Sequence, residues 1–306
     1  MKVINFMALR WPAAVLSLAL IFASIGSLVV KELEWGLDFT GGTLVEVEYA
    51  DSANLPAIRA TLDSEGYEGA LVVSFGTDRD VLIRLPAGTS DEQGAALLAI
   101  LQNSSEVNVE LRRIEFVGPQ VGEELREQGG LAMLLALGLV MLYIAFRFQL
   151  KFALGAVGAL AHDVIIVLGF FSIFGFEFDL TVLAAVLAVI GYSLNDTIVV
   201  SDRIRENFRK LRRTDSIEVI NQSLTETLGR TLVTSLTTLL VLVSLALVGG
   251  EMIRGFAIAL LVGIFVGTYS SIYVAANLLI ALDVSKDDLI IPLKEGADEE
   301  DLLLDP

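Results

Sequence analysis

The sequence predicts a polytopic α-helical membrane protein with six transmembrane helices and one extracytoplasmic ferredoxin-like α+β domain between helices 1 and 2. Three observations lead to this fold class. Of the 306 residues, 54% are hydrophobic and only 19% are charged, whereas a soluble domain carries about 25% charged residues. Six long apolar stretches divide the chain, and an acidic block of about a hundred residues separates the first two. This pattern excludes a plain soluble enzyme, a disordered chain and a fibrous repeat.

Each apolar stretch is long enough to cross a hydrocarbon core of roughly 30 Å, which takes about 20 helical residues. The predicted spans are Trp11–Val30, Gly130–Phe148, Phe152–Phe174, Leu180–Val200, Thr231–Val248 and Gly255–Leu282. The first span also has features of a signal peptide, namely a basic start and small residues near its end. We expect an uncleaved helix instead, because the apolar run is long. Its removal would leave five spans and would reverse nothing else in the charge pattern.

The net charge of −17 is concentrated in two segments. Residues 31–128 hold seven basic and 19 acidic side chains, and residues 283–306 hold two basic and nine acidic ones. Six Lys and Arg residues lie between Arg203 and Arg213, after the fourth span. Because short cytoplasmic loops are enriched in Lys and Arg, we expect this loop and both termini in the cytoplasm. The acidic balance argues against a nucleic-acid partner.

These observations divide the chain into four parts. They are the N-terminus with transmembrane helix 1 (1–30), a periplasmic domain (31–128), helices 2–6 with a basic cytoplasmic loop at 201–229 (129–282), and an acidic cytoplasmic tail (283–306). Within the loop, the apolar residues of Ser216–Leu228 recur at helical spacing. This spacing predicts a helix that lies on the cytoplasmic membrane surface.

The residue pattern of the periplasmic block predicts the element order β-α-β-β-α-β. Alternating apolar and polar residues are typical of half-buried strands, and cap residues mark the helix ends. The predicted elements are strand Thr43–Ala50, helix Leu55–Glu65, strands Ala70–Phe75 and Val81–Leu85, helix Asp91–Gln102 and strand Val107–Val117. This order is that of the ferredoxin-like fold, which hosts many functions and by itself assigns none.

Ionisable side chains at bilayer depth cost at least about 2.5–3.5 kcal/mol, so each is a functional candidate. Asp196 lies roughly 24 Å into the fourth span, and Ser193, Asn195 and Thr197 are its polar neighbours in sequence. Burial disfavours the charged form of a carboxylate, which favours proton exchange near neutral pH. We therefore predict a proton-carrying carboxylate, with a structural, hydrogen-bonded aspartate as the alternative.

Three further groups are candidates for the same proton pathway. His162 and Asp163 are adjacent near mid-depth of the third span, so their side chains point about 100° apart. Either one of them tunes the proton site, or Asp163 bonds a neighbouring helix and His162 is a satisfied neutral imidazole. Arg230 begins the fifth span at the depth expected for Asp196, where the two would form a switchable ion pair. An arginine that snorkels to the interface is the alternative.

Other kinds of site lack support in the sequence. The chain has no cysteine and one histidine, and no phosphate-binding loop motif follows a strand. We therefore predict no catalytic residue, no cofactor and no metal ion. Small residues recur at Gly155 and Ala159 and at Gly263 and Gly267, which predicts close helix packing.

Four sequence blocks resemble conserved blocks of the SecD/SecF protein-export family, within the resistance-nodulation-division (RND) superfamily. They are GLDFTGGT (36–43), VGPQVG (117–122), GYSLNDTIVVSDRIREN (191–207) and the fifth-span segment 223–238. Four blocks in the correct order are far more specific than any one alone. The first block supplies a candidate motif loop with Asp38, Gly41 and Gly42, and for Asp38 a helix cap or a bond to loop amides is the favoured role.

The resemblance implies six helices of RND type in an auxiliary subunit of the Sec translocase, without covalent catalysis. It implies a multi-pass protein of the bacterial inner membrane that pairs with SecD, associates with the SecYEG channel and YajC, and meets unfolded preproteins. It also implies that the proton-motive force drives late steps of translocation. Asp196 and Arg230 match the family's proton pathway, and Thr234 lies in the matching fifth-span block.

Two other functions remain open at this point. Half of an RND-type proton-coupled exporter of small molecules or lipids would share the helices, although such exporters usually carry both halves and larger external domains. A non-conducting scaffold of a membrane complex would tolerate loss of the Asp196 carboxylate.

Overall fold

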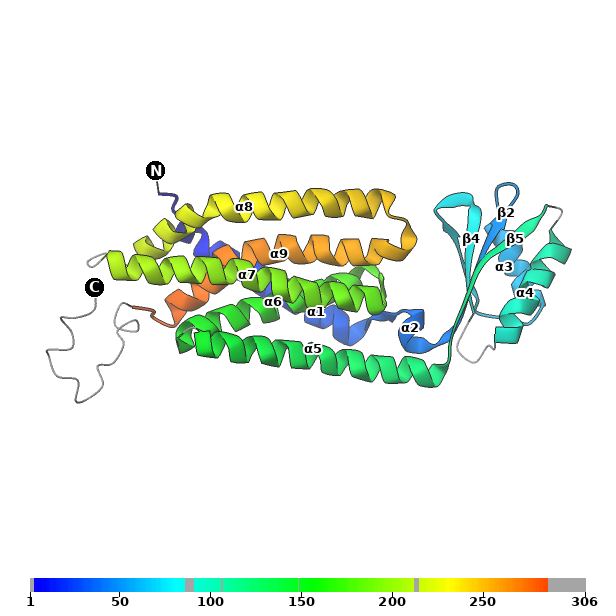
Figure 1. Cartoon of the computed structure of the whole chain (residues 1–306), viewed down its shortest axis with the longest axis horizontal. Helices are drawn as coiled ribbons and strands as arrows, with labels where there is room; N and C mark the ends of the chain where they lie inside the picture. The colour runs from blue at the N-terminus through cyan, green and yellow to red at the C-terminus, as the bar shows by residue number, and fades with distance from the viewer. Residues whose placement is uncertain (1–2, 86–90, 106, 148, 212–214, 286–306) are drawn as a thin grey trace, which may run out of the picture.

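The structure is a computed structural model that describes residues 3–85, 91–105, 107–147, 149–211 and 215–285. A helical bundle carries an α+β domain at one end (Figure 1). Within the described residues, six helices are long and apolar enough to cross a membrane, which confirms the predicted fold class. They are α1 (Arg10–Val30), α5 (Pro119–Arg147), α6 (Leu150–Phe174), α7 (Leu180–Lys210), α8 (Ser216–Val248) and α9 (Glu251–Ala281). A short 3-10 helix, η1 (Phe6–Leu9), precedes α1.

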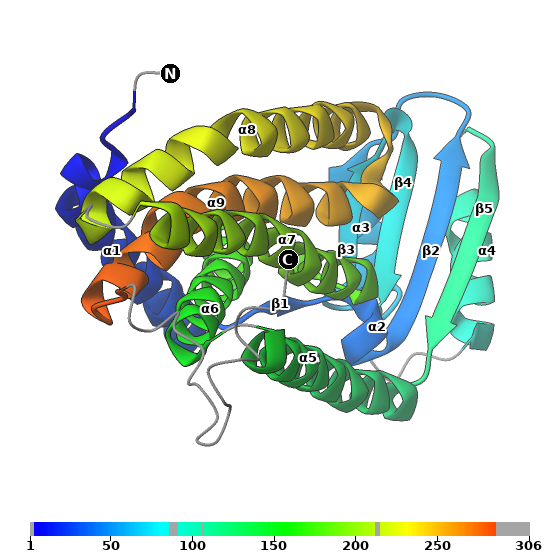
Figure 2. The same ribbon diagram turned by 60° about the vertical axis from the view of Figure 1, so that its left-hand side comes forward.

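The α+β domain has one antiparallel sheet with both of its helices on the same face (Figure 2). Its elements are β2 (Gly42–Tyr49), α3 (Leu55–Ser64), β3 (Leu71–Phe75), β4 (Thr77–Leu85), α4 (Asp91–Ser104) and β5 (Val109–Val117). The strands lie in the order β3-β4-β2-β5, so the predicted ferredoxin-like arrangement is confirmed. Val45, Val47 and Ile83 are fully buried, because alternate residues of each strand face the helices.

The segment 201–229 was expected to be a loop with a helix at Ser216–Leu228; the helix is confirmed, and the two flanking membrane helices extend further into the segment than expected. Helix α7 continues to Lys210 and α8 already begins at Ser216, so most of the segment is helical. Ion pairs of Glu206 with Arg203 and Lys210, three and four residues away, support the extension. The segment 216–228 is the start of α8, where most of its apolar residues are buried against the bundle.

Helix α5 and a small unpredicted sheet connect the domain to the bundle. Because α5 begins at Pro119, the last part of the block expected as external is already helix. After α1, strand β1 (Glu34–Trp35) pairs in parallel with β6 (Glu177–Phe178), from the turn between α6 and α7. The short helix α2 (Leu37–Thr40) follows β1 and leads into β2. The acidic tail beyond residue 285 lies outside the described residues.

Small residues bring the inner helices together, as predicted. A Cβ added at Gly263 of α9 would lie 2.1 Å from a side-chain carbon of Val189 on α7. A Cβ at Gly169 of α6 would lie 2.1 Å from that of Ser24, so α1 also packs closely on the bundle.

Candidate functional site

Two buried carboxylates lie in the middle of the bundle, and Asp196 of α7 is the first. The residue is 9% exposed, and each of its oxygens accepts a hydrogen bond. Thr231 Oγ1 of α8 donates to Oδ1, and Ser271 Oγ of α9 donates to Oδ2, both at 2.6 Å. Such donors offset the several kcal/mol that desolvation of a carboxylate costs. Asp196 is therefore the point at which three helices meet.

Asp163 of α6 is the second carboxylate, and it is completely buried. Its Oδ2 accepts hydrogen bonds from Ser193 Oγ of α7 at 2.5 Å and from Ser270 Oγ of α9 at 2.7 Å. Its Oδ1 lies 2.9 Å from Nδ1 of His162. The expected bond from Asp163 to a neighbouring helix is present, and the adjacent imidazole also contacts it.

Successive hydroxyls of α9 connect the two carboxylates. Ser270 binds Asp163 and Ser271 binds Asp196, while Ser193 stands about one turn before Asp196 on α7. Both carboxylates are thus joined to the same two helices. The sequence analysis missed Ser270 and Ser271, although two adjacent hydroxyls within an apolar span were the available signal.

His162 is 3% exposed and has one ring nitrogen free of hydrogen bonds. Its Nε2 is buried without a partner among the described residues, while Nδ1 contacts Asp163. The ring lies 6.2 Å from that of Tyr269, whose hydroxyl donates to the Ala13 carbonyl oxygen of α1. His162 thus contacts Asp163 through one ring nitrogen, and its other nitrogen leaves a buried hydrogen-bonding position unused.

The other polar residues predicted near Asp196 lie elsewhere. Ser193 binds Asp163, Asn195 is exposed, and the buried Thr197 hydroxyl has no hydrogen-bond partner in the described part of the chain. Thr234 is exposed and donates to backbone carbonyls of its own helix. The reason is helical geometry, because residues next to Asp196 in sequence point in other directions around α7.

Arg230 has the predicted depth but a different orientation. The next residue along α8, Thr231, contacts Asp196, which places Arg230 at the level of the carboxylate. Its side chain is exposed, however, and the structure has no ion pair between Arg230 and any described residue. A neutral hydroxyl thus occupies the position beside Asp196 that the arginine was expected to take.

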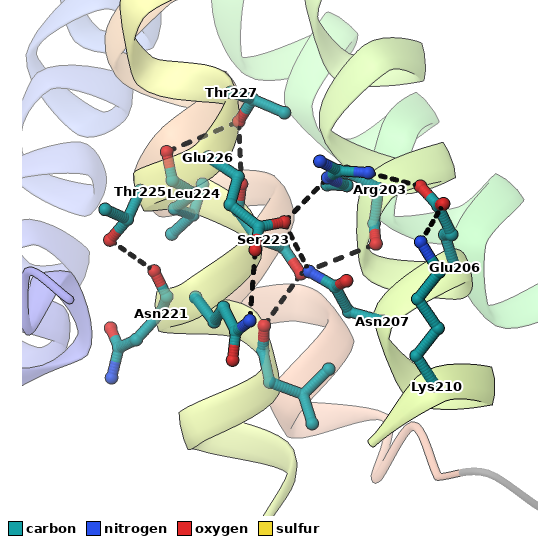
Figure 3. Close-up of polar contacts among 12 residues, drawn as sticks. Arg203, Glu206, Asn207, Lys210, Asn221, Ser223, Leu224, Thr225, Glu226 and Thr227 are labelled. Carbon is teal, nitrogen blue, oxygen red and sulfur yellow. Dashed lines mark hydrogen bonds and ion pairs between the residues drawn. The ribbon is translucent and has the colours of Figure 1, made fainter. Parts of the chain in front are cut away.

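A second polar cluster joins the extensions of α7 and α8 (Figure 3). The Asn207 side-chain amide donates to Ser223 Oγ and to Glu226 Oε2, both at 2.9 Å. Arg203 Nε lies 2.7 Å from the same Glu226 oxygen. Asn207 is buried, so these contacts fix how the two helices pack beyond the carboxylates.

The predicted motif loop connects the α+β domain to the bundle. Gly41 has φ +70°, and a Cβ at this position would lie 2.8 Å from Cα of Pro119, so only glycine fits. Gly42 follows with φ 131° at the start of β2. Asp38 Oδ2 accepts a hydrogen bond from the backbone N–H of Leu180 at 3.0 Å, which confirms the favoured bond to a backbone amide. The loop is a structural junction at the start of α5 and α7.

Metal chemistry has no support in the described residues. No three His, Asp or Glu side chains among them are arranged to hold a metal ion.

Six membrane helices around buried carboxylates, with one small α+β domain, define a multi-pass membrane protein. Residues 97–285 match the family described as "Protein export membrane protein SecD/SecF, C-terminal", and residues 26–53 match the "SecD/SecF GG Motif". The chain therefore belongs to the SecD/SecF protein-export family, as its sequence blocks predicted.

Relatives match over nearly the full length of the chain. It is 54% identical over 290 residues to "Protein translocase subunit SecF" of Pseudomonas aeruginosa, which covers 94% of each chain. The protein of the same name from Escherichia coli O157:H7 is 44% identical over 99% of this chain and 95% of its own. The crystal structure of SecDF from Thermus thermophilus, titled a translocon-associated membrane protein, superposes with a TM-score of 0.84 at 40% identity. The match covers 92% of this chain but 39% of that SecDF chain.

Proposed function

We propose that this chain is the SecF-type subunit of a bacterial Sec translocase. In this proposal it pairs with SecD in the inner membrane and uses the proton-motive force to promote late steps of preprotein translocation. The names of the relatives support the translocase role. The matched SecDF chain is more than twice as long as the part aligned here, which supports pairing with a second, SecD-like half. Beyond SecD, we expect SecYEG, YajC and the unfolded preprotein as partners.

The observation that carries the proton-coupled part of this proposal is the position of Asp196 between three helices. As a carboxylate it accepts hydrogen bonds from Thr231 and Ser271. A protonated carboxyl group carries an O–H donor, so one of the two hydroxyls must reorient when a proton binds. Because these hydroxyls belong to α8 and α9, proton uptake changes the contact of α7 with one of these two helices.

Asp163 provides a second proton-exchanging group between the same helices. Its donors Ser193 and Ser270 come from α7 and α9, and His162 contacts its other oxygen. A proton that crosses about 100 mV releases about 2.3 kcal/mol, which is enough to shift an equilibrium between two helix arrangements by more than tenfold.

Orientation and partner contact complete the proposal. Both termini lie in the cytoplasm and the α+β domain in the periplasm, because the basic residues gather after the fourth span. Arg230 is exposed on α8 at the depth of Asp196, and an arginine at bilayer depth needs a partner. Arg230 faces SecD in the complex, and its charge acts on the proton site from that interface.

Export of a secreted precursor tests the proposal. Pulse-chase labelling compares cells that rely on Asp196→Asn or Asp163→Asn with cells that rely on Asp215→Asn. Asp215 is an exposed residue before α8 whose side chain makes no capping bond, so it controls for the same chemical change. We expect slow precursor processing in the two buried variants, at normal membrane levels of the chain and of SecD.

Normal export with Asp196→Asn would contradict proton coupling at this residue and would favour the non-conducting scaffold. If the Asp196→Asn protein accumulates poorly in the membrane, export with Asp196→Glu is measured instead, provided that this variant reaches a normal membrane level. It keeps a titratable group, so its export should exceed that of the amide variant.

A further inference from the structure

A cationic cavity lies at the end of the bundle away from the α+β domain, apart from the buried carboxylates. Its volume is about 440 Å³, and its walls come from the C-terminal ends of α5 and α7. The lining residues are Arg147, Asp202, Arg205, Glu206, Arg209 and Lys210. Four cationic side chains and two carboxylates therefore line one cavity, with Arg147 on α5 and the other five residues on α7.

Both carboxylates of the cavity are already engaged by more than one cation. Asp202 lies 3.4 Å from Arg147 and 3.2 Å from Arg205. Glu206 lies 2.5 Å from Lys210 and is also paired with Arg203, outside the cavity (Figure 3). The acidic groups thus offset part of the positive charge, and the lining keeps two cations in excess.

Arg209 contributes charge without a carboxylate of its own. It is exposed and forms no ion pair with a described residue. Lys210 is paired with Glu206, yet its side chain is 62% exposed, so it also reaches the open side. An anion in the cavity would therefore find donors without breaking the existing ion pairs.

Exposed apolar side chains lie on α5 and α6 next to Arg147. Arg147 ends α5 and Leu150 begins α6. Phe146 is 85% exposed and Leu150 is 72% exposed at these two helix ends. Leu142 and Tyr143, about one turn earlier on α5, are also more than half exposed. An exposed apolar strip therefore runs along α5 to the cations.

We propose that this cavity binds the phosphate headgroup of an anionic phospholipid, with the acyl chains along the exposed strip of α5. Basic cavities between helices at a membrane surface suit such headgroups, and each cation adds to the attraction. A phosphate ester in solution would meet the same cations, but it would leave the strip unused. The general preference for Lys and Arg on one side of a membrane accounts for the charge, but not for a cavity shared by two helices.

Native mass spectrometry of the full-length chain in detergent tests the assignment. The probes are phosphatidylglycerol, phosphatidylcholine of the same acyl chains, and inorganic phosphate. We expect phosphatidylglycerol to bind and raise the melting temperature, whereas phosphatidylcholine and phosphate do neither. The Arg147→Gln/Arg209→Gln variant should bind phosphatidylglycerol roughly tenfold more weakly, because two cations near the headgroup are lost.

Arg10→Gln is the matched control, since Arg10 begins α1 outside the cavity. It should leave the affinity unchanged. If the double variant misfolds, Arg209→Gln alone provides the test, because it breaks no described ion pair. Equal binding of both lipids, or equal loss with Arg10→Gln, would overturn the proposal. An equal melting-temperature rise with inorganic phosphate would assign the cavity to soluble phosphate groups and likewise reject the lipid.

Discussion

Helices α6, α7 and α9 differ from α1, α5 and α8 in what surrounds them (Figure 2). In their most apolar stretches, 56%, 56% and 44% of the residues of the first three are buried, against 17%, 11% and 17% in the others. Asp163 and Asp196 both lie on the first set. Because a charge exposed to lipid is costly, these two carboxylates are placed where protein surrounds them. The outer helices keep apolar faces that lipid or a partner subunit can cover.

The largest difference between the two sets should appear when a glycine is replaced by leucine. Gly263 of α9 faces Val189 of α7 at a distance that leaves no room for a side chain, whereas a Cβ at Gly138 of α5 has nothing within 4 Å. Gly263→Leu should cost at least about 1–3 kcal/mol by overpacking and lower the membrane level of the protein. Gly138→Leu should be close to neutral. Equal losses of membrane level and of melting temperature in the two variants, measured by quantitative immunoblots and melting curves, would contradict the difference between inner and outer helices.

Removal of a hydroxyl tests the same contrast within α8. Thr231→Val deletes the donor to Asp196 Oδ1, which should cost about 1–3 kcal/mol and slow export. Thr237 is exposed and donates only to carbonyls of its own helix, so Thr237→Val should change little. Melting temperatures in detergent and pulse-chase export measure both effects. A similar response to the two substitutions would mean that burial of the acceptor does not matter.

A smaller effect is expected where the domain joins the bundle. Arg84 of β4 lies 2.9 Å from Glu177 and donates to the Trp35 carbonyl oxygen and to Thr40 Oγ1, both at 3.0 Å. Arg84→Gln should loosen β1 and β6 and speed their amide hydrogen exchange, at a cost of about 1 kcal/mol or less. Arg112→Gln, which removes an ion pair with Glu48 inside the domain, is the control. Unchanged exchange at β1 and β6 with Arg84→Gln would show that Arg84 does not fix this junction.

A last prediction, whose effect is absent at neutral pH, extends the comparison to the core of the α+β domain. Burial raises the pKa of the Tyr49 phenol from 10.0 to about 12. The unfolded chain therefore ionises first, and the stability present below pH 10 falls as the pH rises toward 12. Tyr49→Phe should lose less stability over this range. The difference between the ultraviolet pH titration curves of the unchanged protein and the Tyr49→Phe variant should have its midpoint near pH 12. A midpoint near 10 would mean that this core admits water.

Sequence alone predicted those features that depend on local pattern. Apolar runs identified the spans, alternation identified the strands of the domain, and a charge within an apolar run identified Asp163 and Asp196. The partners of the two carboxylates could not be predicted, because they depend on how α8 and α9 rotate against α7. For the same reason Thr231, and not Arg230, faces Asp196. The extension of α7 to Lys210 was not predicted, because the many charges of this part of the chain masked a helical face that is buried in the bundle.

Infrared difference spectroscopy of the purified chain, with the pH stepped across neutrality, tests most directly whether Asp196 carries a proton. A protonated carboxylic acid has a carbonyl stretching band that a carboxylate lacks. We expect a band that appears on acidification, is absent in Asp196→Asn and persists in the exposed-site variant Asp215→Asn. A band unchanged by Asp196→Asn would contradict proton exchange at this residue and leave it a purely structural role.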